Sequence, residues 1–166
     1  MDYFYAHHND IHERNPILRG DESKHLARVL RKEIGENVFV TDGAGRMFEA
    51  VIESFEAAAT HCRIVALHKN FNEPAVNITL AVSPLKNPGR FDYLVEKAVE
   101  LGVRQIIPIR CDRTISHRDK QERLQKIALA AMKQCGRSVL PAIALQISFA
   151  ELLSTGKKYD VACIPH

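Results

Sequence analysis

The chain has 166 residues, 46% of them hydrophobic and 26% charged, with a formal net charge of +3. This composition predicts a buried core and a soluble protein, and no apolar run approaches the roughly 20 residues that a membrane span needs. The polar N-terminal stretch predicts no signal peptide. Four widely spaced cysteines without a CxxC pair predict buried free thiols in the cytoplasm rather than a metal site or disulfides.

Charge is distributed unevenly along the chain. Residues 1–72 carry nine Lys and Arg against eleven Asp and Glu, a net −2, whereas residues 73–166 carry fourteen against nine, a net +5. A basic second half is compatible with a polyanionic partner such as nucleic acid, and equally with a solvated basic surface.

The one helix predicted in the first seventy residues spans 21–35, where Gly35 ends it. Leu26, Val29 and Leu30 fall on one face and indicate the buried side. Basic side chains that could contact phosphate lie largely on the other face: His25, Arg28 and Arg31. A solvent-facing helix surface is the alternative interpretation of the same spacing.

The rest of this first part has the pattern of short strands. Residues 37–42 and 46–55 flank a glycine-containing turn and predict a β-hairpin, and residues 61–69 predict another strand. Short strands joined by tight turns in a small unit indicate an N-terminal β-barrel or curled sheet. We therefore expect a first domain over residues 1–72.

A polar link ending at Pro74 separates this part from a stretch with a different spacing of apolar residues. The pattern predicts five elements that alternate strand and helix: a strand over 76–85, a helix from Pro88 to Gly102, a strand over 103–110, a helix over 120–136 and a strand over 159–165. Ser148 and Glu151 form a capping box that predicts a short helix before the last strand. This alternation is the signature of a parallel α/β sheet, and we expect a second domain over residues 73–166. Parallel sheets are usually covered on both faces and continue further, so the sequence looks interrupted at His166.

Two stretches of the second part carry further candidate residues. Lys86 and Arg90 follow the first α/β strand, at the sheet edge where ligands collect in open α/β folds. Glu96 lies on the following helix and either faces a ligand or forms a surface ion pair with Lys97. The third helix is followed by a loop in which we identify no structural role for two polar residues, Arg137 and Ser138.

Three segments together resemble the RsmE family of small-subunit rRNA methyltransferases. They are HLARVLR at 25–31, LKNPGRFDYLVEKAVELGV at 85–103 and RLQKIALAAMKQCGRSVLPAI at 123–143. The resemblance runs in the same order through essentially the whole chain. It implies a PUA-like RNA-binding barrel followed by the first half of a SPOUT methyltransferase domain, an α/β fold whose knotted C-terminal segment is absent here.

The resemblance also implies a reaction and roles for single residues. The family methylates N3 of a uridine in 16S rRNA of the small ribosomal subunit with S-adenosylmethionine, and its members are homodimers in the cytoplasm. His25, Arg28, Arg31, Lys86 and Ser138 would then contact RNA. Catalytic candidates are Arg90 and Arg137, which would stabilise a uridine anion, and Glu96, which would act as base. The cofactor-binding residues are expected beyond His166, so we expect this chain alone to be inactive.

Two other classes of function remain open. A non-catalytic RNA-binding module would bind RNA through residues 1–72 alone, with a strong salt dependence. A nucleotide-handling α/β enzyme unrelated to RNA would have no affinity for RNA at physiological salt.

Overall fold

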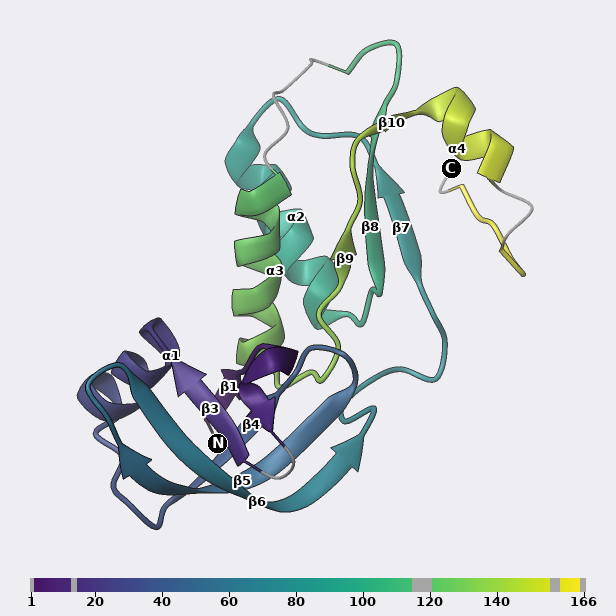
Figure 1. Cartoon of the computed structure of the whole chain (residues 1–166). Helices are drawn as coiled ribbons and strands as arrows, with labels where there is room; N and C mark the ends of the chain where they lie inside the picture. The colour runs from purple at the N-terminus through teal and green to yellow at the C-terminus, as the bar shows by residue number, and fades with distance from the viewer. Residues whose placement is uncertain (1, 13–14, 115–120, 156–158, 165–166) are drawn as a thin grey trace. The chain divides into compact units, whose positions relative to one another are not determined.

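The computed structural model describes residues 2–12, 15–114, 121–155 and 159–164. The described residues divide into two compact units (Figure 1). The first comprises residues 1–76 together with 129–140, and the second comprises residues 77–128 together with 141–166. The sequence pattern placed one boundary near residue 72, but it did not predict that a later segment, 129–140, belongs with the N-terminal unit.

The first unit is built on a six-stranded sheet with the strand order β1-β4-β5-β6-β3-β2. The predicted hairpin is present, because β4 and β5 are antiparallel and Val38 lies opposite Ala50. Two register shifts between β5 and β6 accompany the strong curvature of these strands in Figure 1, as β-bulges do. The strand bounds are β1 Tyr3–Tyr5, β2 Ile11–His12, β3 Asn15–Arg19, β4 Asn37–Thr41, β5 Arg46–Phe55 and β6 Ala59–Lys69.

The core of this unit consists of buried side chains from β1, β3, β4, β5 and β6 and from the helical segment that follows β3. Leu26 is fully buried and joins the strand residues Phe4, Leu18, Val38, Val40 and Ile52 in one cluster. Along β3, buried positions alternate with more exposed ones, as a half-buried strand requires. A 3-10 turn, η1 His8–Asp10, lies between β1 and β2.

The helix predicted over 21–35 is shorter and of a different kind. It consists of α1 (Asp21–Lys24) and a π-helical turn, η2 (His25–Val29). The prediction that Val29 is buried is wrong, because its side chain is 65% exposed. A π-turn is wider than an α-turn, so a residue three positions after Leu26 rotates away from the buried face.

The second unit contains a four-stranded parallel sheet. β8 (Gln105–Arg110) pairs with β7 (Thr79–Val82) on one side and with β10 (Ile147–Ser148) on the other, and β9 (Ala142–Ile143) also pairs with β8. The architecture is therefore mixed α/β. The predicted strand over 159–165 is wrong for its described residues, because 159–164 have no strand pairing and Val161 and Ile164 are nearly 80% exposed. Pro165 lies outside the described residues. Its place in the sheet is taken by β9 and β10, which lie before the last helix.

The helices of this part agree closely with the sequence pattern. Their bounds are α2 Pro88–Glu100, α3 Gln121–Cys135 and α4 Phe149–Thr155. Asn87 caps α2 by accepting a hydrogen bond from the Gly89 N–H at 2.9 Å. The capping box of α4 is present, because the Ser148 hydroxyl accepts from the Glu151 N–H and Glu151 accepts from the Ser148 N–H. Leu101 shares the apolar spacing of this helix, which predicts an inward side chain, but it is 78% exposed because it lies past the last turn of α2.

All four cysteines are free, but they differ in burial. Cys62 lies in the core of the first unit, and burial raises the pKa of its thiol to about 12. The expectation of uniformly buried thiols is wrong for Cys163, which is exposed. Within the described residues, every helix is too short or too polar to cross a membrane.

Candidate functional site

The π-turn η2 gives the basic candidates of the first unit their positions. The Leu30 N–H donates to the His25 carbonyl at 3.0 Å, which is the i→i+5 bond of a π-helix. Arg31 then adopts a positive φ of 52° and turns the chain away. Such single π-turns are often found at functional sites. The consequence here is that His25, Arg28 and Arg31 are all exposed on a turn whose inward residue is Leu26.

Two of these basic side chains are not engaged by the protein. Arg28 and Arg31 have no ion-pair partner among the described residues, whereas Lys32, next in the chain, contacts Asp2 and Glu36 at 3.5 and 3.0 Å. The hydrogen bond from Lys32 lowers the pKa of the Glu36 carboxyl, after the larger effect of a backbone bond from Glu33. An exposed guanidinium without a carboxylate partner is available for a bidentate contact to phosphate.

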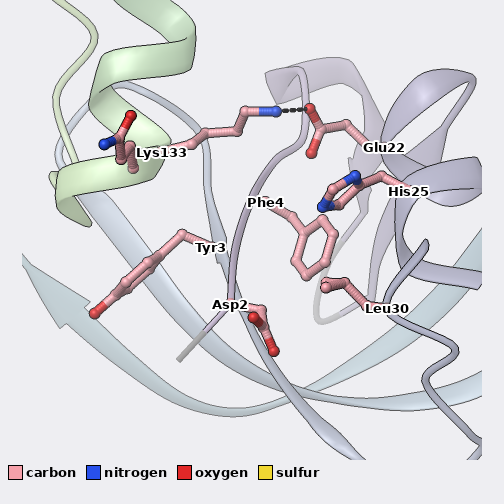
Figure 2. Close-up of a pocket in the computed structure, with 8 residues that line it drawn as sticks. Asp2, Tyr3, Phe4, Glu22, His25, Leu30 and Lys133 are labelled. Atoms are coloured by element: carbon pink, nitrogen blue, oxygen red, sulfur yellow. Dashed lines mark hydrogen bonds and ion pairs between the residues drawn. The ribbon is translucent and has the colours of Figure 1, made fainter.

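A cavity of about 280 Å³ lies beside the π-turn (Figure 2). Its lining comes from β1, the α1–η2 helix and the last turn of α3, all within the first compact unit: Asp2, Tyr3, Phe4, Glu22, His25, Leu30, Lys133 and Gln134. Of these residues only His25 was a candidate from the sequence. The others lie on a core strand or next to it, near the start of a helix, or near the end of a helix. No local signal in the sequence brings them together.

An ion pair closes one side of this cavity. The Lys133 ammonium group contacts the Glu22 carboxylate, as the dashed line in Figure 2 shows. The other oxygen of Glu22 accepts a hydrogen bond from the Tyr5 N–H at 3.3 Å. Glu22 therefore links α1 both to β1 and to the end of α3, and it fixes one wall of the cavity.

The loop after α3 has a structural role that the sequence did not reveal. Arg137 and Glu73 form an ion pair in which each side chain is only 3% exposed, with Nη2 and Oε2 2.6 Å apart. The same carboxylate accepts hydrogen bonds from the backbone N–H groups of Ser138 and Val139, both at 2.9 Å. The Ser138 hydroxyl donates to the Phe71 carbonyl at 2.9 Å. The expectation that Arg137 and Ser138 lie in a loop without a structural role is wrong, because they join this loop to the link after β6.

Tight packing continues at Gly136, the residue before this pair. Gly136 has a positive φ of 69°, and an added Cβ would lie 2.6 Å from the Tyr3 ring. The Thr41 hydroxyl donates to the Ser138 carbonyl at 3.0 Å. Residues 136–139 are thus an integral part of the first unit, and Arg137 is engaged there by a carboxylate.

The candidates of the second unit are distributed over the loop after β7 and over α2. Lys86 and Arg90 are exposed, Lys86 before the helix and Arg90 in its first turn. Glu96 lies 3.0 Å from Lys97, whose ammonium group also contacts Glu100 at 2.8 Å. These bonds, with that to Glu100 the stronger, raise the pKa of Lys97. The surface ion pair considered for Glu96 is therefore present.

Two family models match the chain. Residues 72–166 match a family described as an RNA methyltransferase domain, and residues 18–56 match an RNA methyltransferase PUA domain. The first match covers the second unit and the link before it, and the second covers the π-turn and much of the curved sheet.

Solved structures with the same fold are also rRNA methyltransferases. A probable rRNA methyltransferase from Porphyromonas gingivalis is 33% identical with a TM-score of 0.83, over 92% of this chain and 63% of that chain. A ribosomal RNA small subunit methyltransferase E from Neisseria gonorrhoeae, bound to S-adenosyl methionine, is 30% identical with a TM-score of 0.81, over 92% and 64%. The enzyme of the same name from a Synechocystis strain is 29% identical over 86% of this chain and 47% of its own length. The chain thus spans about half to two thirds of the length of these relatives.

Proposed function

We propose that this chain, which belongs to the RNA methyltransferase family, methylates N3 of a uridine in 16S rRNA of the small ribosomal subunit as part of an S-adenosylmethionine-dependent enzyme. The observation that carries the proposal is the family match over residues 72–166, in one chain with a PUA match over residues 18–56. Two relatives named ribosomal RNA small subunit methyltransferase E align with 86% and 90% of this chain. A homodimer of the SPOUT type is the assembly that the resemblance implies.

We assign the two parts of the reaction to different parts of the chain. Residues 1–72, as a PUA-like barrel, would hold the RNA through the basic π-turn, where Arg28 and Arg31 are exposed and have no ion-pair partner in the described part of the chain. Residues 73–166, as the first part of a SPOUT domain, would present Lys86 and Arg90 to the substrate. This division places phosphate contacts in the first part and the reacting base near the second.

S-adenosylmethionine supplies the methyl group, and we assign it no residue of this chain. The cavity of about 280 Å³ lies in the first unit and falls below the roughly 300–1,000 Å³ that is usual for ligand sites of this kind. Methyl transfer is a displacement that depends on holding two reactants in line, and N3 of uridine must also lose a proton.

Arg90 is the catalytic candidate whose environment fits best. Its guanidinium is exposed at the start of α2, where it can stabilise the anion that forms when N3 loses its proton. The other two candidates are already engaged: Glu96 forms an ion pair with Lys97, and Arg137 forms one with Glu73 in the first unit. We therefore expect Arg90→Ala to reduce methyl transfer much more than RNA binding, and equal losses would remove Arg90 from this role.

Methyl transfer to small-subunit RNA is the direct test. The full-length enzyme that contains this chain is incubated with undermodified small subunits and radiolabelled S-adenosylmethionine. The product is mapped by reverse transcription, which stops at N3-methyluridine because the methyl group blocks base pairing. A stop at one uridine supports the proposal. RNA binding that falls steeply with salt, without any transfer, favours the non-catalytic RNA-binding module instead. Absence of both contradicts each of these functions.

A further inference from the structure

The loops after β7 and β8 leave the sheet of the second unit at the same end. The two strands are parallel, with Val82 opposite Pro108, so both chains emerge from the carboxyl end of the sheet (Figure 1). Ligands of open α/β sheets collect beyond this end, among the loops that follow the strands. The loop after β7 and the first turn of α2 hold Lys86 and Arg90, which the proposed function already uses. The loop after β8, residues 111–114, lies beside them.

Hydrogen bonds between hydroxyl groups hold the second loop against the first. The hydroxyl oxygens of Ser83, directly after β7, and Thr114 lie 2.6 Å apart. Thr114 Oγ1 also accepts a hydrogen bond from the Cys111 N–H at 2.8 Å, and the Thr114 N–H donates to the Cys111 carbonyl at 2.9 Å. Residues 111–114 are therefore a closed turn that is tied to the end of β7. The exposed side chain of Arg113 extends from this fixed backbone.

Two arginines at the end of β8 are not engaged by the protein. Arg110 is the last residue of β8 and Arg113 lies in the closed turn, and both are exposed. Neither has an ion-pair partner in the described part of the chain, whereas Arg123 on α3 contacts the carboxylate of Asp92. The carboxylate of the neighbouring helix α4, Glu151, is used by the cap of its own helix. Both guanidinium groups are thus free to bind an anion.

Positive charge is concentrated at this end of the sheet. Residues 83–91 and 110–114 hold one carboxylate, that of Asp112, and four cations. The cations are Lys86, Arg90, Arg110 and Arg113. The opposite end, residues 75–78 and 101–104, holds one cation, Arg104, and no carboxylate. A polyanion therefore meets most of this charge at the carboxyl end, where ligands of such sheets bind.

The arrangement of these groups favours a nucleic acid backbone over a single phosphate ion. A single phosphate is typically held by free backbone N–H groups, but the N–H groups of Cys111 and Thr114 are engaged within the turn. The four cations are instead exposed side chains at separate positions. Exposed Lys and Arg on neighbouring loops are the groups that contact successive phosphates of a nucleic acid strand.

We propose that Arg110 and Arg113 contact the phosphates of the RNA strand beside the nucleotide that Lys86 and Arg90 face. The second unit then has its own phosphate-binding surface at the carboxyl end of its sheet, in addition to the basic π-turn of the first unit. This inference rests on the proposed RNA methyltransferase function and adds two RNA-contacting residues to it.

The salt dependence of RNA binding tests the proposal. Fluorescein-labelled oligouridine is titrated with the full chain, and affinity is measured by fluorescence anisotropy at salt concentrations from about 50 to 200 mM. Each phosphate contact to a single strand contributes about 0.7 to the slope of log affinity against log salt. We therefore expect Arg110→Gln with Arg113→Gln to reduce this slope by about 1.4. Because both side chains are exposed, the urea midpoint should stay unchanged.

A matched control removes the same amount of charge elsewhere in the second unit. Arg104→Gln with Lys126→Gln takes two cations from the amino end of β8 and from the exposed surface of α3. This variant should keep the slope of the unchanged chain. In a chain that already carries Arg28→Gln and Arg31→Gln, the pair at the end of β8 should reduce the remaining slope by the same amount, because the two surfaces contribute independently.

Failure of this inference differs from failure of the proposed function. If the RNA binds but the slope of the Arg110 and Arg113 variant equals that of the unchanged chain, the end of β8 contacts no phosphate and RNA binding through the π-turn stands. An equal fall in the control variant would mean that only diffuse charge acts, which also overturns the inference. If no RNA binds even at low salt, RNA binding itself fails and this surface with it.

Discussion

Removal of the Glu73 carboxylate is a perturbation for which the structure predicts a large loss of stability. Its two oxygens accept hydrogen bonds from the Arg137 guanidinium and from the backbone N–H groups of Ser138 and Val139. In Glu73→Ala the guanidinium stays in a place where only 3% of the side chain is exposed, and two N–H groups lose their acceptor. Breaking one partner of a buried pair costs about 3–5 kcal/mol.

This cost is large relative to the stability of a small domain. A native protein of this size is stable by about 5–15 kcal/mol, so a loss of about 4 kcal/mol removes a large share of the total. We expect the urea midpoint, followed by far-ultraviolet circular dichroism, to fall accordingly, and Arg137→Ala to behave alike. Exchanging both residues for apolar ones of similar size, Glu73→Leu with Arg137→Met, should recover the part of the loss that comes from the buried charge, but not the part that comes from the N–H groups of Ser138 and Val139.

The matched control is an exposed ion pair of similar length. Glu53 and Arg63 lie 2.7 Å apart on neighbouring strands, with 43% and 56% of their side chains exposed. Exposed pairs contribute about 0–1 kcal/mol, so Glu53→Ala should leave the urea midpoint almost unchanged. A loss below about 1 kcal/mol for Glu73→Ala, no greater than for the control, would refute the reasoning.

Three further predictions concern other parts of the molecule. Ellman's reagent at pH 8 should label Cys163 rapidly and leave Cys62 unreacted until the protein unfolds, because burial raises the pKa of Cys62 to about 12. Gly136→Ala should destabilise the first unit by more than about 1 kcal/mol in the same urea assay, since it combines a positive φ with a contact of 2.6 Å to a tyrosine ring. Hydrogen bonds from Ser148 lower the pKa of the Glu151 carboxyl, so the cap of α4 stabilises the folded state above the ordinary carboxyl pKa and weakens as the pH falls through the lowered one. Hydrogen exchange of the α4 amides should therefore show the cap at neutral pH and its loss in acid, and Ser148→Ala should weaken it by about 1 kcal/mol.

Local sequence patterns predicted the helices and turns well where contacts between neighbouring residues decide the structure. The spacing of apolar residues and the caps fixed α2 and α4, because a helix face and an N-cap are properties of neighbouring residues. The turn between β4 and β5 was predictable for the same reason. The exposure of Val29 was not predictable in this way, because the choice between an α-turn and a π-turn depends on packing around Leu26 rather than on the local residues.

The features that the sequence pattern missed depend on contacts between residues that are far apart in the chain. The apolar stretch at 159–164 has the composition of a strand, but the place beside β8 is taken by β10, where Ile147 pairs with Ile109. In the candidate site, Glu22 meets Lys133 across 111 positions, and Glu73 meets Arg137 across 64. No periodicity or motif relates residues so far apart, so the cavity and its ion pair became visible only in the folded chain.

The buried pair changes how any experiment on Arg137 must be interpreted. A loss of methyl transfer in Arg137→Ala has two possible origins, the removal of a catalytic cation and the release of the loop that Glu73 holds. Glu73→Gln separates them, because it keeps the guanidinium and a hydrogen-bond acceptor while removing the carboxylate charge. If Arg137 acts on the substrate, a folded Glu73→Gln protein should retain most of the transfer that Arg137→Ala loses. If Arg137 acts only through the loop, the two variants should lose transfer in proportion to their loss of stability, and Arg90 remains the cation to test for catalysis.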